Sequence, residues 1–311
     1  MNKSAYVIAT GLVLAFLVGF VFFAFNVYDS SLNTVAEEND TVAVYENITY
    51  GNKERNVLDL YIPAMADDKE ENALVLFLHG GSWTSGDKSS MADDCRFFAE
   101  RGYVTATMNY SFLNMFGEEK TDFKTMLTEI ATAFSVIKGY ATAQGVNITK
   151  AAVAGYSAGA HLALLYAYSM VEHSPVPVLF VHSKAGPADF STFSPSSPDV
   201  QEFMAKMGVA NDEKSVGELL KNEKIIAMTK AVSPVSYVKS GMAPAILSYG
   251  RKDNLVVWEN VVSMMNVLDA TGVDYTLIEY PNSAHGLNKD ADCAQRSVDV
   301  MLDYAKKYFG Y

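Results

Sequence analysis

Two stretches near the start of the chain alternate between apolar and polar positions. One runs from Val42 to Tyr50, and the other runs from Asn56 to Ile62 and ends at Pro63. Alternation with period two is typical of half-buried strands, and these two stretches predict a hairpin or meander. Ala73 to Leu78 is instead an unbroken apolar run, which predicts a strand that is buried on both faces.

Beyond this strand, apolar runs and helical patterns follow one another in turn. Helices are predicted at 90–101, 122–144, 158–171, 256–271 and 290–309, and strands at 103–108, 151–154, 178–181, 244–249 and 274–280. This repeated order predicts an α/β fold, in which a mostly parallel central sheet carries helices on both faces.

Residues 186–242 interrupt this order. They contain two weakly amphipathic segments, near 200–207 and 216–228, and a structureless loop of that length is unusual in a compact domain. We therefore expect a small helical cap insertion that lies over the carboxyl ends of the strands, as a lid or pocket wall. The alternative is a peripheral excursion without a role in substrate binding.

The beginning of the chain is apolar on all faces. Ala5 to Phe25 carries no charge and has about the length that a helix needs to cross a bilayer. Lys3 precedes this segment and acidic residues follow it, and because positive residues stay on the cytoplasmic side the rest of the chain is expected outside. We predict a transmembrane anchor over 1–26, a linker over 27–40 and one extracytoplasmic domain over 41–311. Secretion after cleavage of a signal peptide is the alternative.

Composition narrows the classes of function. The 311 residues suffice for one large α/β domain, and a chain that is 50% hydrophobic and 19% charged is not a mostly disordered one. The net charge of -12 argues against nucleic acid as a partner, because phosphates require a basic surface. Two cysteines, Cys95 and Cys293, cannot build a disulfide framework or a zinc knuckle.

The chemistry of the chain centres on Gly155-Tyr156-Ser157-Ala158-Gly159. An apolar run enters this Gly-x-Ser-x-Gly turn and a helix-forming segment leaves it. Strand, sharp turn and helix form the context in which a serine hydroxyl is exposed at the end of a sheet. The flanking glycines permit the tight turn, because side chains there would collide with neighbouring backbone.

A glycine-rich loop, His79-Gly80-Gly81-Ser82-Trp83, follows the strand at 73–78. Adjacent glycines let backbone N–H groups turn towards a common point, as a developing oxyanion requires. The N–H of Ala158, directly after the serine, is the expected companion donor. A phosphate-binding loop is the alternative, but the Gly-Lys-Ser/Thr ending of such loops is absent.

His285 is the expected base for Ser157, and Asp253 is the expected acid. His285 lies in a turn-rich loop directly after the last predicted strand, and Asp253 lies in the loop after the preceding one. The resulting order, Ser-Asp-His, is that of a serine elbow enzyme. Asp253 as an ordinary solvated loop residue is the alternative. The other histidines are expected to brace the glycine-rich loop (His79), to be structural (His161), or to be surface or packing residues (His173 and His182).

Together these motifs resemble α/β-hydrolase-fold carboxylesterases of the hormone-sensitive-lipase-like and bacterial feruloyl-esterase-like group. The resemblance covers residues 48–311, and its most specific parts are 79–88, 109–110, 155–162, Asp253 and 282–286. It implies that Gly81 and Ser82 offer oxyanion N–H groups beside Ala158. Ser82 and Ala160 replace two glycines of the family pattern. Backbone donors survive both changes, whereas the acyl pocket beside Ser82 changes shape.

The resemblance implies a serine hydrolase that cleaves small-molecule esters of small or aromatic acids through an acyl-enzyme, without a metal or organic cofactor. The glycine-rich loop also resembles that of arylformamidases, so an arylformamidase or a peptidase with the same triad is the alternative. A catalytically inactive cell-surface binding module is a further one. In this fold the helices that carry Cys95 and Cys293 pack on one sheet face, so the two could pair outside the cytoplasm. Two free, buried cysteines are the other possibility.

Overall fold

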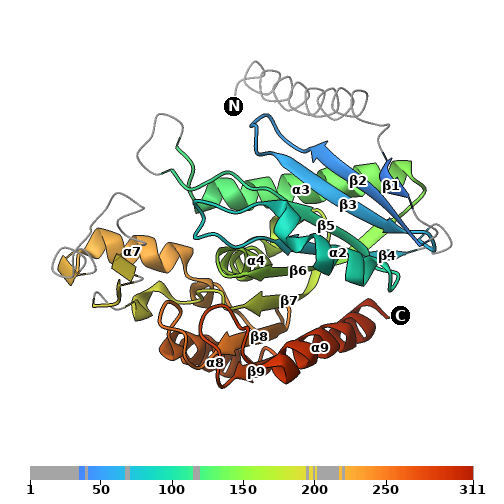
Figure 1. Cartoon of the computed structure of the whole chain (residues 1–311). Coiled ribbons are helices and arrows are strands. Elements are labelled where there is room, and N and C mark those ends of the chain that lie inside the picture. The colour runs from blue at the N-terminus through green and yellow to red at the C-terminus, as the bar shows by residue number, and fades with distance from the viewer. Residues whose placement is uncertain are drawn as a thin grey trace, which may run out of the picture.

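The computed structural model describes residues 35–38, 41–66, 71–114, 120–193, 196–198, 200–201, 217–218 and 221–310. The described part forms a central sheet with helices against both faces (Figure 1). The strands are β1 (Val35–Glu38), β2 (Val42–Thr49), β3 (Val57–Pro63), β4 (Asn72–Leu78), β5 (Val104–Met108), β6 (Ile148–Tyr156), β7 (Val178–Lys184), β8 (Ala245–Gly250) and β9 (Tyr275–Tyr280).

The strand order across the sheet is β1-β2-β3-β5-β4-β6-β7-β8-β9. The first three strands pair antiparallel with their neighbours, so β2 and β3 form the predicted hairpin. From β5 to β9 every pairing is parallel. The mostly parallel sheet that the alternating pattern predicts is therefore confirmed. All its parallel strands end at one edge, where loops from distant parts of the chain meet.

Strand β4 shows why its sequence is apolar without interruption. Leu74, Leu76 and Leu78 belong to one cluster of core residues, whereas Ala73, Val75 and Phe77 belong to the other. Successive side chains of a strand point to opposite faces, so both faces of β4 are covered. The helices α3 (Phe123–Ala143), α4 (Ala158–Ser169) and α8 (Trp258–Thr271) pack on the first face, and α2 (Ala92–Ala99) and α9 (Ala291–Phe309) pack on the second.

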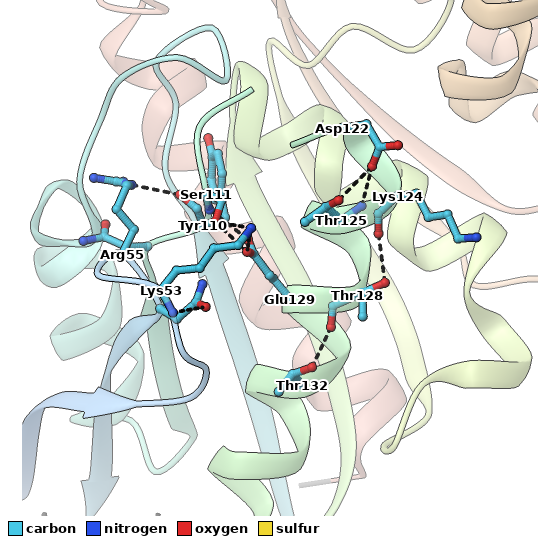
Figure 2. A network of polar contacts seen from close by, with 12 residues as sticks. Lys53, Arg55, Tyr110, Ser111, Asp122, Lys124, Thr125, Thr128, Glu129 and Thr132 are labelled. Atoms are coloured by element: carbon cyan, nitrogen blue, oxygen red, sulfur yellow. Dashed lines mark hydrogen bonds and ion pairs between the residues drawn. The ribbon is translucent and has the colours of Figure 1, made fainter. Parts of the chain in front are cut away.

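Side chains at the helix ends account for where the helices begin. The carboxylate of Asp122 accepts hydrogen bonds from the backbone N–H and the hydroxyl of Thr125, which caps α3 (Figure 2). Asp87 caps the short 3-10 helix η1 (Lys88–Met91) in the same way, through the N–H of Ser89. The helix predicted at 90–101 is thus η1 followed by α2, and it begins two residues earlier than the apolar pattern indicates because Asp87 caps it.

The structure corrects the prediction for the linker 27–40 and covers only part of the insertion 186–242. Strand β1 lies inside the predicted linker 27–40 and pairs with β2. An edge strand of this kind pairs through its main chain and carries charge without difficulty, so its side chains show no alternation. In the insertion 186–242, the described elements are helical: η3 (Phe190–Thr192), α7 (Glu223–Val232) and η4 (Pro234–Ser236). Most of the segment predicted near 200–207 lies outside the described residues.

The predicted membrane anchor, residues 1–26, also lies outside the described residues. The helices that the structure does describe include none with the length and apolar character to span a bilayer. Cys95 is buried and Cys293 is partly exposed, and both thiols are free. The disulfide considered above is therefore not formed, and Cys293 instead lies 3.3 Å from the carbonyl oxygen of Glu279.

Candidate active site

Ser157 stands between β6 and α4 with backbone angles that a non-glycine residue rarely adopts. Its φ of 52° and ψ of -117° lie outside the usual regions, and such angles are a strain of order 1–3 kcal/mol that the surroundings must overcome. The N–H of Ser157 donates to Lys184 O at 2.8 Å, and its carbonyl accepts from His161 N at 3.0 Å. Ser157 therefore sits on the sharp turn that its motif predicts.

Gly155 and Gly159 are necessary on both sides of this turn. A Cβ atom on Gly155 would lie 2.4 Å from the carbonyl carbon of Gly159. A Cβ atom on Gly159 would lie 2.1 Å from Leu78 O. Neither position has room for a side chain, because Gly155 packs against the backbone of the elbow itself and Gly159 packs against the end of β4.

The imidazole of His285 lies between Ser157 and Asp253. Its Nε2 is 2.8 Å from Ser157 Oγ, and its Nδ1 is 2.8 Å from Asp253 Oδ2. A carboxylate can only accept, so Nδ1 carries the proton and Nε2 offers its lone pair to the serine hydroxyl. The structure thus brings together the three side chains that the motif order predicted, from the loops after β6, β8 and β9.

Asp253 is positioned by its own loop. Its carboxylate is fully buried, and Oδ1 accepts hydrogen bonds from Leu255 N at 2.9 Å and Val256 N at 3.0 Å. These donors leave Oδ2 for the imidazole. The alternative of a solvated loop residue does not fit this burial.

The loop that carries His285 depends on residues that the motif did not single out. Asp290 accepts from Ser283 Oγ at 2.6 Å and from Asn282 N at 3.0 Å. The hydroxyl of Tyr156, next to the serine, donates to His285 O at 2.9 Å. At the end of β8, a Cβ atom on Gly250 would lie 2.5 Å from Ser283 O, so a glycine is required where the loop passes.

The glycine-rich loop turns beside Ser157 with three successive residues at positive φ. These are Gly81 at 120°, Ser82 at 51° and Trp83 at 60°. A Cβ atom on Gly81 would lie 2.2 Å from Ser85 O, and one on Gly80 would lie 3.4 Å from the Cβ of Ser157. The loop therefore approaches the elbow closely, and its glycines allow that approach.

Hydrogen bonds hold the carbonyl that precedes each expected oxyanion donor. Gly80 O accepts from His79 Nδ1 at 2.7 Å. Gly81 O accepts from the N–H groups of Thr84 and Ser85 and from Ser85 Oγ. In a trans peptide the C=O and the following N–H point in opposite directions. The N–H groups of Gly81 and Ser82 are therefore turned away from these partners.

The peptide between Ser157 and Ala158 follows the same rule, because its carbonyl accepts from His161 N. Within the described residues, none of the N–H groups of Gly81, Ser82 and Ala158 donates to another residue. Their carbonyl partners orient all three groups, which leaves three backbone donors unused around the elbow.

His79 is buried and braces the loop, as the sequence predicts. Its ring stacks on Tyr110 with 4.3 Å between the centroids, and the Tyr110 hydroxyl donates to His79 O at 2.8 Å. Burial, together with the nearby positive charge of Arg55, lowers the pKa of His79 to about 4 although its hydrogen bond to Gly80 opposes this shift. The ring is therefore neutral near pH 7.

His161 is a structural histidine, again as predicted. Its Nδ1 accepts from Trp83 Nε1 at 3.1 Å, and its Nε2 donates to Val232 O, at the end of α7, at 2.7 Å. Burial lowers its pKa to about 4, so the neutral ring can accept on one side and donate on the other. His161 thereby ties the glycine-rich loop to the insertion. His182 is a packing residue that contacts Ser248, and His173 is exposed.

The last two residues of the 79–88 motif, Asp87 and Lys88, bind to β3 and to the residue that follows β5. Lys88 Nζ lies 2.7 Å from both carboxylate oxygens of Asp59, and both side chains are buried. Asn109 accepts from Lys88 N at 2.6 Å and donates to Asp87 at 2.8 Å. Partial burial acts to raise the pKa of Asp87, but hydrogen bonds from Ser89 and Asn109 prevail and lower it to about 2. The contacts of Asn109 with Asp87 and Lys88 therefore join the two motifs, residues 79–88 and 109–110.

The chemistry that these residues offer is that of a serine nucleophile, a histidine base, a buried carboxylate and free backbone donors at one sheet edge. In the part of the chain that is described, no group of three or more His, Cys, Asp or Glu side chains is arranged to hold a metal ion.

Sheet order, elbow and loop order together define an α/β-hydrolase fold. The family model BD-FAE matches residues 58–268, which is more than half of the chain. The protein therefore belongs to the BD-FAE family.

Curated relatives match parts or most of the chain. The probable isoprenylcysteine α-carbonyl methylesterase ICME of Oryza sativa subsp. japonica is 32% identical over 39% of this chain and 27% of its own length. Esterase LipQ of Mycobacterium tuberculosis is 25% identical over 85% of this chain and 62% of its own length. Kynurenine formamidase of Danio rerio is 30% identical over 38% of this chain and 37% of its own length. The chain thus spans less than two thirds of each of these relatives.

A solved structure extends the similarity to the whole fold. Esterase B from Lactobacillus rhamnosis superimposes with a TM-score of 0.64 and 20% identity, over 97% of this chain and 96% of the other. At that identity the similarity is evidence for the fold, and it confirms the predicted α/β-hydrolase architecture.

Proposed function

We propose that this protein is a serine hydrolase that cleaves carboxylic esters of small or aromatic acids. The observation that carries this proposal is the chain of two 2.8 Å contacts from Ser157 through His285 to Asp253, beside three unused backbone N–H groups. Membership of the BD-FAE family and the similarity to esterases support the same class of reaction.

The proposed cycle begins when Ser157 Oγ attacks the carbonyl carbon of the ester while His285 Nε2 takes the hydroxyl proton. The electron pair of the carbonyl moves onto its oxygen, which the N–H groups of Gly81, Ser82 and Ala158 stabilise. When this intermediate collapses, the C–O bond to the alcohol breaks and His285 returns the proton to the leaving oxygen. Water then attacks the acyl-enzyme with the same base, which releases the acid and regenerates Ser157.

The fixed tautomer of His285 is what makes the base effective in this scheme. Asp253 keeps the proton on Nδ1 and stabilises the imidazolium that forms in each step. The three donors are already oriented, so little reorganisation is needed when charge develops on the substrate oxygen.

Covalent labelling and a panel of ester substrates test the proposal. A fluorophosphonate probe is expected to label the wild-type protein and Ser135→Ala, which removes an exposed hydroxyl of α3, but not Ser157→Ala. Aryl esters of acetate, butyrate, octanoate and ferulate compare acyl groups under the same conditions. A wild-type protein that neither reacts with the probe nor hydrolyses any ester would refute the proposed reaction.

A formamidase reaction is the second candidate. The loop from His79 to Trp83 and the similarity to a kynurenine formamidase favour it. The same triad would cleave a formamide, with an aryl amine as the leaving group. N-formyl aryl amines and dipeptides therefore belong in the panel, and the substrate with the highest kcat/KM decides between ester, formamide and peptide.

We also propose that the catalytic domain is held outside the cytoplasm by an uncleaved N-terminal anchor, with secretion as the alternative. This rests on the apolar segment from Ala5 to Phe25. Protease treatment of intact cells, and N-terminal sequencing of the mature protein, test the location and the cleavage separately. Protection of the catalytic domain from protease in intact cells would contradict the proposed location outside the cytoplasm.

A further inference from the structure

Arg55 reaches the back of the glycine-rich loop from the turn between β2 and β3. This turn lies beside the end of β5, where Asn109 N donates to Val57 O at 2.9 Å. Figure 2 shows the side chain of Arg55 directed towards Tyr110, to whose carbonyl Nε donates at 2.9 Å. The guanidinium also lies 3.6 Å from the centre of the Phe112 ring. The Tyr110 carbonyl and the Phe112 ring therefore both hold the orientation of this side chain.

The same guanidinium contacts His79, where the glycine-rich loop begins, and Gly86, three residues beyond the end of that loop at Trp83. Its Nη2 donates to Gly86 O at 3.0 Å and faces His79 Nε2 at 3.4 Å. The two parts of the chain are pressed together at this point, because a Cβ atom on Gly86 would lie 2.2 Å from Gly80 O. Arg55 thus links His79 to Gly86, on the two sides of the glycine-rich turn.

The contact with His79 is directional. Since His79 Nδ1 donates to Gly80 O, its Nε2 carries a lone pair and needs a donor. A guanidinium is always protonated and can only donate, so Arg55 stabilises this tautomer and no other. The tautomer in turn holds Gly80 O, and peptide planarity transmits that restraint to the N–H of Gly81.

We propose that Arg55 is a positioning residue for the ester hydrolysis proposed above, and that it acts through His79 and the Gly80 carbonyl on the oxyanion donor of Gly81. The inference rests on that proposed function. Arg55 does not contact the reacting atoms in this arrangement, so its removal should weaken stabilisation of the transition state more than binding of the substrate.

Lys53 provides a matched control from the same turn. It is also basic and partly exposed, and its Nζ contacts Glu129 at 3.3 Å and Ser111 at 3.2 Å (Figure 2). These partners belong to the start of the loop after β5 and to α3, not to the glycine-rich loop. Lys53→Met therefore removes a cation and its contacts from this network without touching the contacts of His79.

The experiment compares kcat, KM and inhibitor affinity in the wild-type protein, Arg55→Met, Arg55→Lys and Lys53→Met. Loss of one oxyanion donor reduces kcat by about 10²–10³, and a donor that is only misplaced should lose less. We expect kcat to fall on the order of 10- to 100-fold in Arg55→Met with KM almost unchanged. An aryl trifluoromethyl ketone, which forms a tetrahedral adduct, should lose affinity by the same factor. Arg55→Lys should recover part of both losses.

Each outcome decides between the two proposals. If the wild-type protein hydrolyses esters but Arg55→Met keeps the kcat and inhibitor affinity of Lys53→Met, the positioning role is wrong and the proposed reaction stands. If kcat and melting temperature fall together in both variants without any change in inhibitor affinity, Arg55 is merely structural. Should Arg55→Met fail to fold, Arg55→Lys takes its place in the comparison, because lysine keeps the positive charge but loses the forked donors of the guanidinium. Wild-type kcat and inhibitor affinity in Arg55→Lys would then contradict the positioning role. A wild-type protein without activity refutes the reaction itself.

Discussion

The buried pair between Lys88 and Asp59 permits a prediction with a magnitude. Lys88→Met removes the ammonium group that lies 2.7 Å from both oxygens of Asp59. The Asp59 carboxylate, 4% exposed in the wild-type protein, then keeps one donor among the described residues, Asn47 N at 2.8 Å on Oδ1. Removing one partner of a buried ion pair destabilises a protein by about 3–5 kcal/mol. At about 2–3 °C per kcal/mol, the melting temperature should fall by roughly 10 °C.

Thermal and urea unfolding of three variants, compared with the wild-type protein, test this reasoning. Lys88→Met should be the least stable. Adding Asp59→Leu should recover most of the loss, because the unpaired charge disappears and an apolar pair replaces it. Glu71→Gln, in the exposed pair that Lys150 forms with Glu71 at 3.4 Å, should cost less than about 1 kcal/mol. A double variant no more stable than Lys88→Met would show that the buried charge is not the cause.

Three further predictions concern the site itself. Asp253→Asn should lower kcat by about 10⁴, since an amide donor facing Nδ1 favours the wrong tautomer of His285; steady-state kinetics check this, and fluorophosphonate labelling should slow in parallel. Gly159→Ala should not yield soluble folded protein by circular dichroism, because its methyl group would lie 2.1 Å from Leu78 O; a folded, active variant would contradict the packing argument. His161→Phe keeps an aromatic ring but removes the hydrogen bonds that Trp83 Nε1 and Val232 O make with His161, so urea unfolding should show a loss of about 1–3 kcal/mol. The pKa of His161 is about 4 in the folded protein, below the ordinary value of 6.5, so this stability is present above pH 6.5 and is lost as the pH falls towards 4. His161→Phe should flatten that slope in melting curves between pH 7 and 4.

The fold could be predicted from the sequence to the extent that side-chain patterns reflect burial. β4 is buried on both faces and reads as an apolar run, whereas β2 is covered on one face and alternates. Strand β1 escaped this reasoning, because its pairing with β2 uses the main chain and requires no side-chain pattern. The helix start predicted at 90 shifted for a related reason: the cap Asp87 acts through a hydrogen bond that apolar periodicity does not register.

The candidate site follows the same division. Ser157, Asp253 and His285 come together as predicted because each follows a parallel strand, and those strands end at a common edge. Their catalytic roles stay predictions until activity is measured. Tyr156, Asp290 and Arg55 could not be found this way. Each acts through a backbone carbonyl or amide of another segment, and such a contact depends on tertiary geometry that no local motif records.

The free donors beside Ser157 belong to the main chain, which has a consequence for how the family can vary. A replacement at position 82, such as the serine present here, changes the side chain beside the elbow but leaves the N–H in place. A change of side chain at 82 can therefore alter the surroundings of a substrate without removing the backbone donor. The positions without this freedom are those that aim the peptides: Gly80, Gly81 and the side chains of His79 and Ser85. The space for a side chain at 82 and the need for glycine at 81 are then two results of one backbone turn.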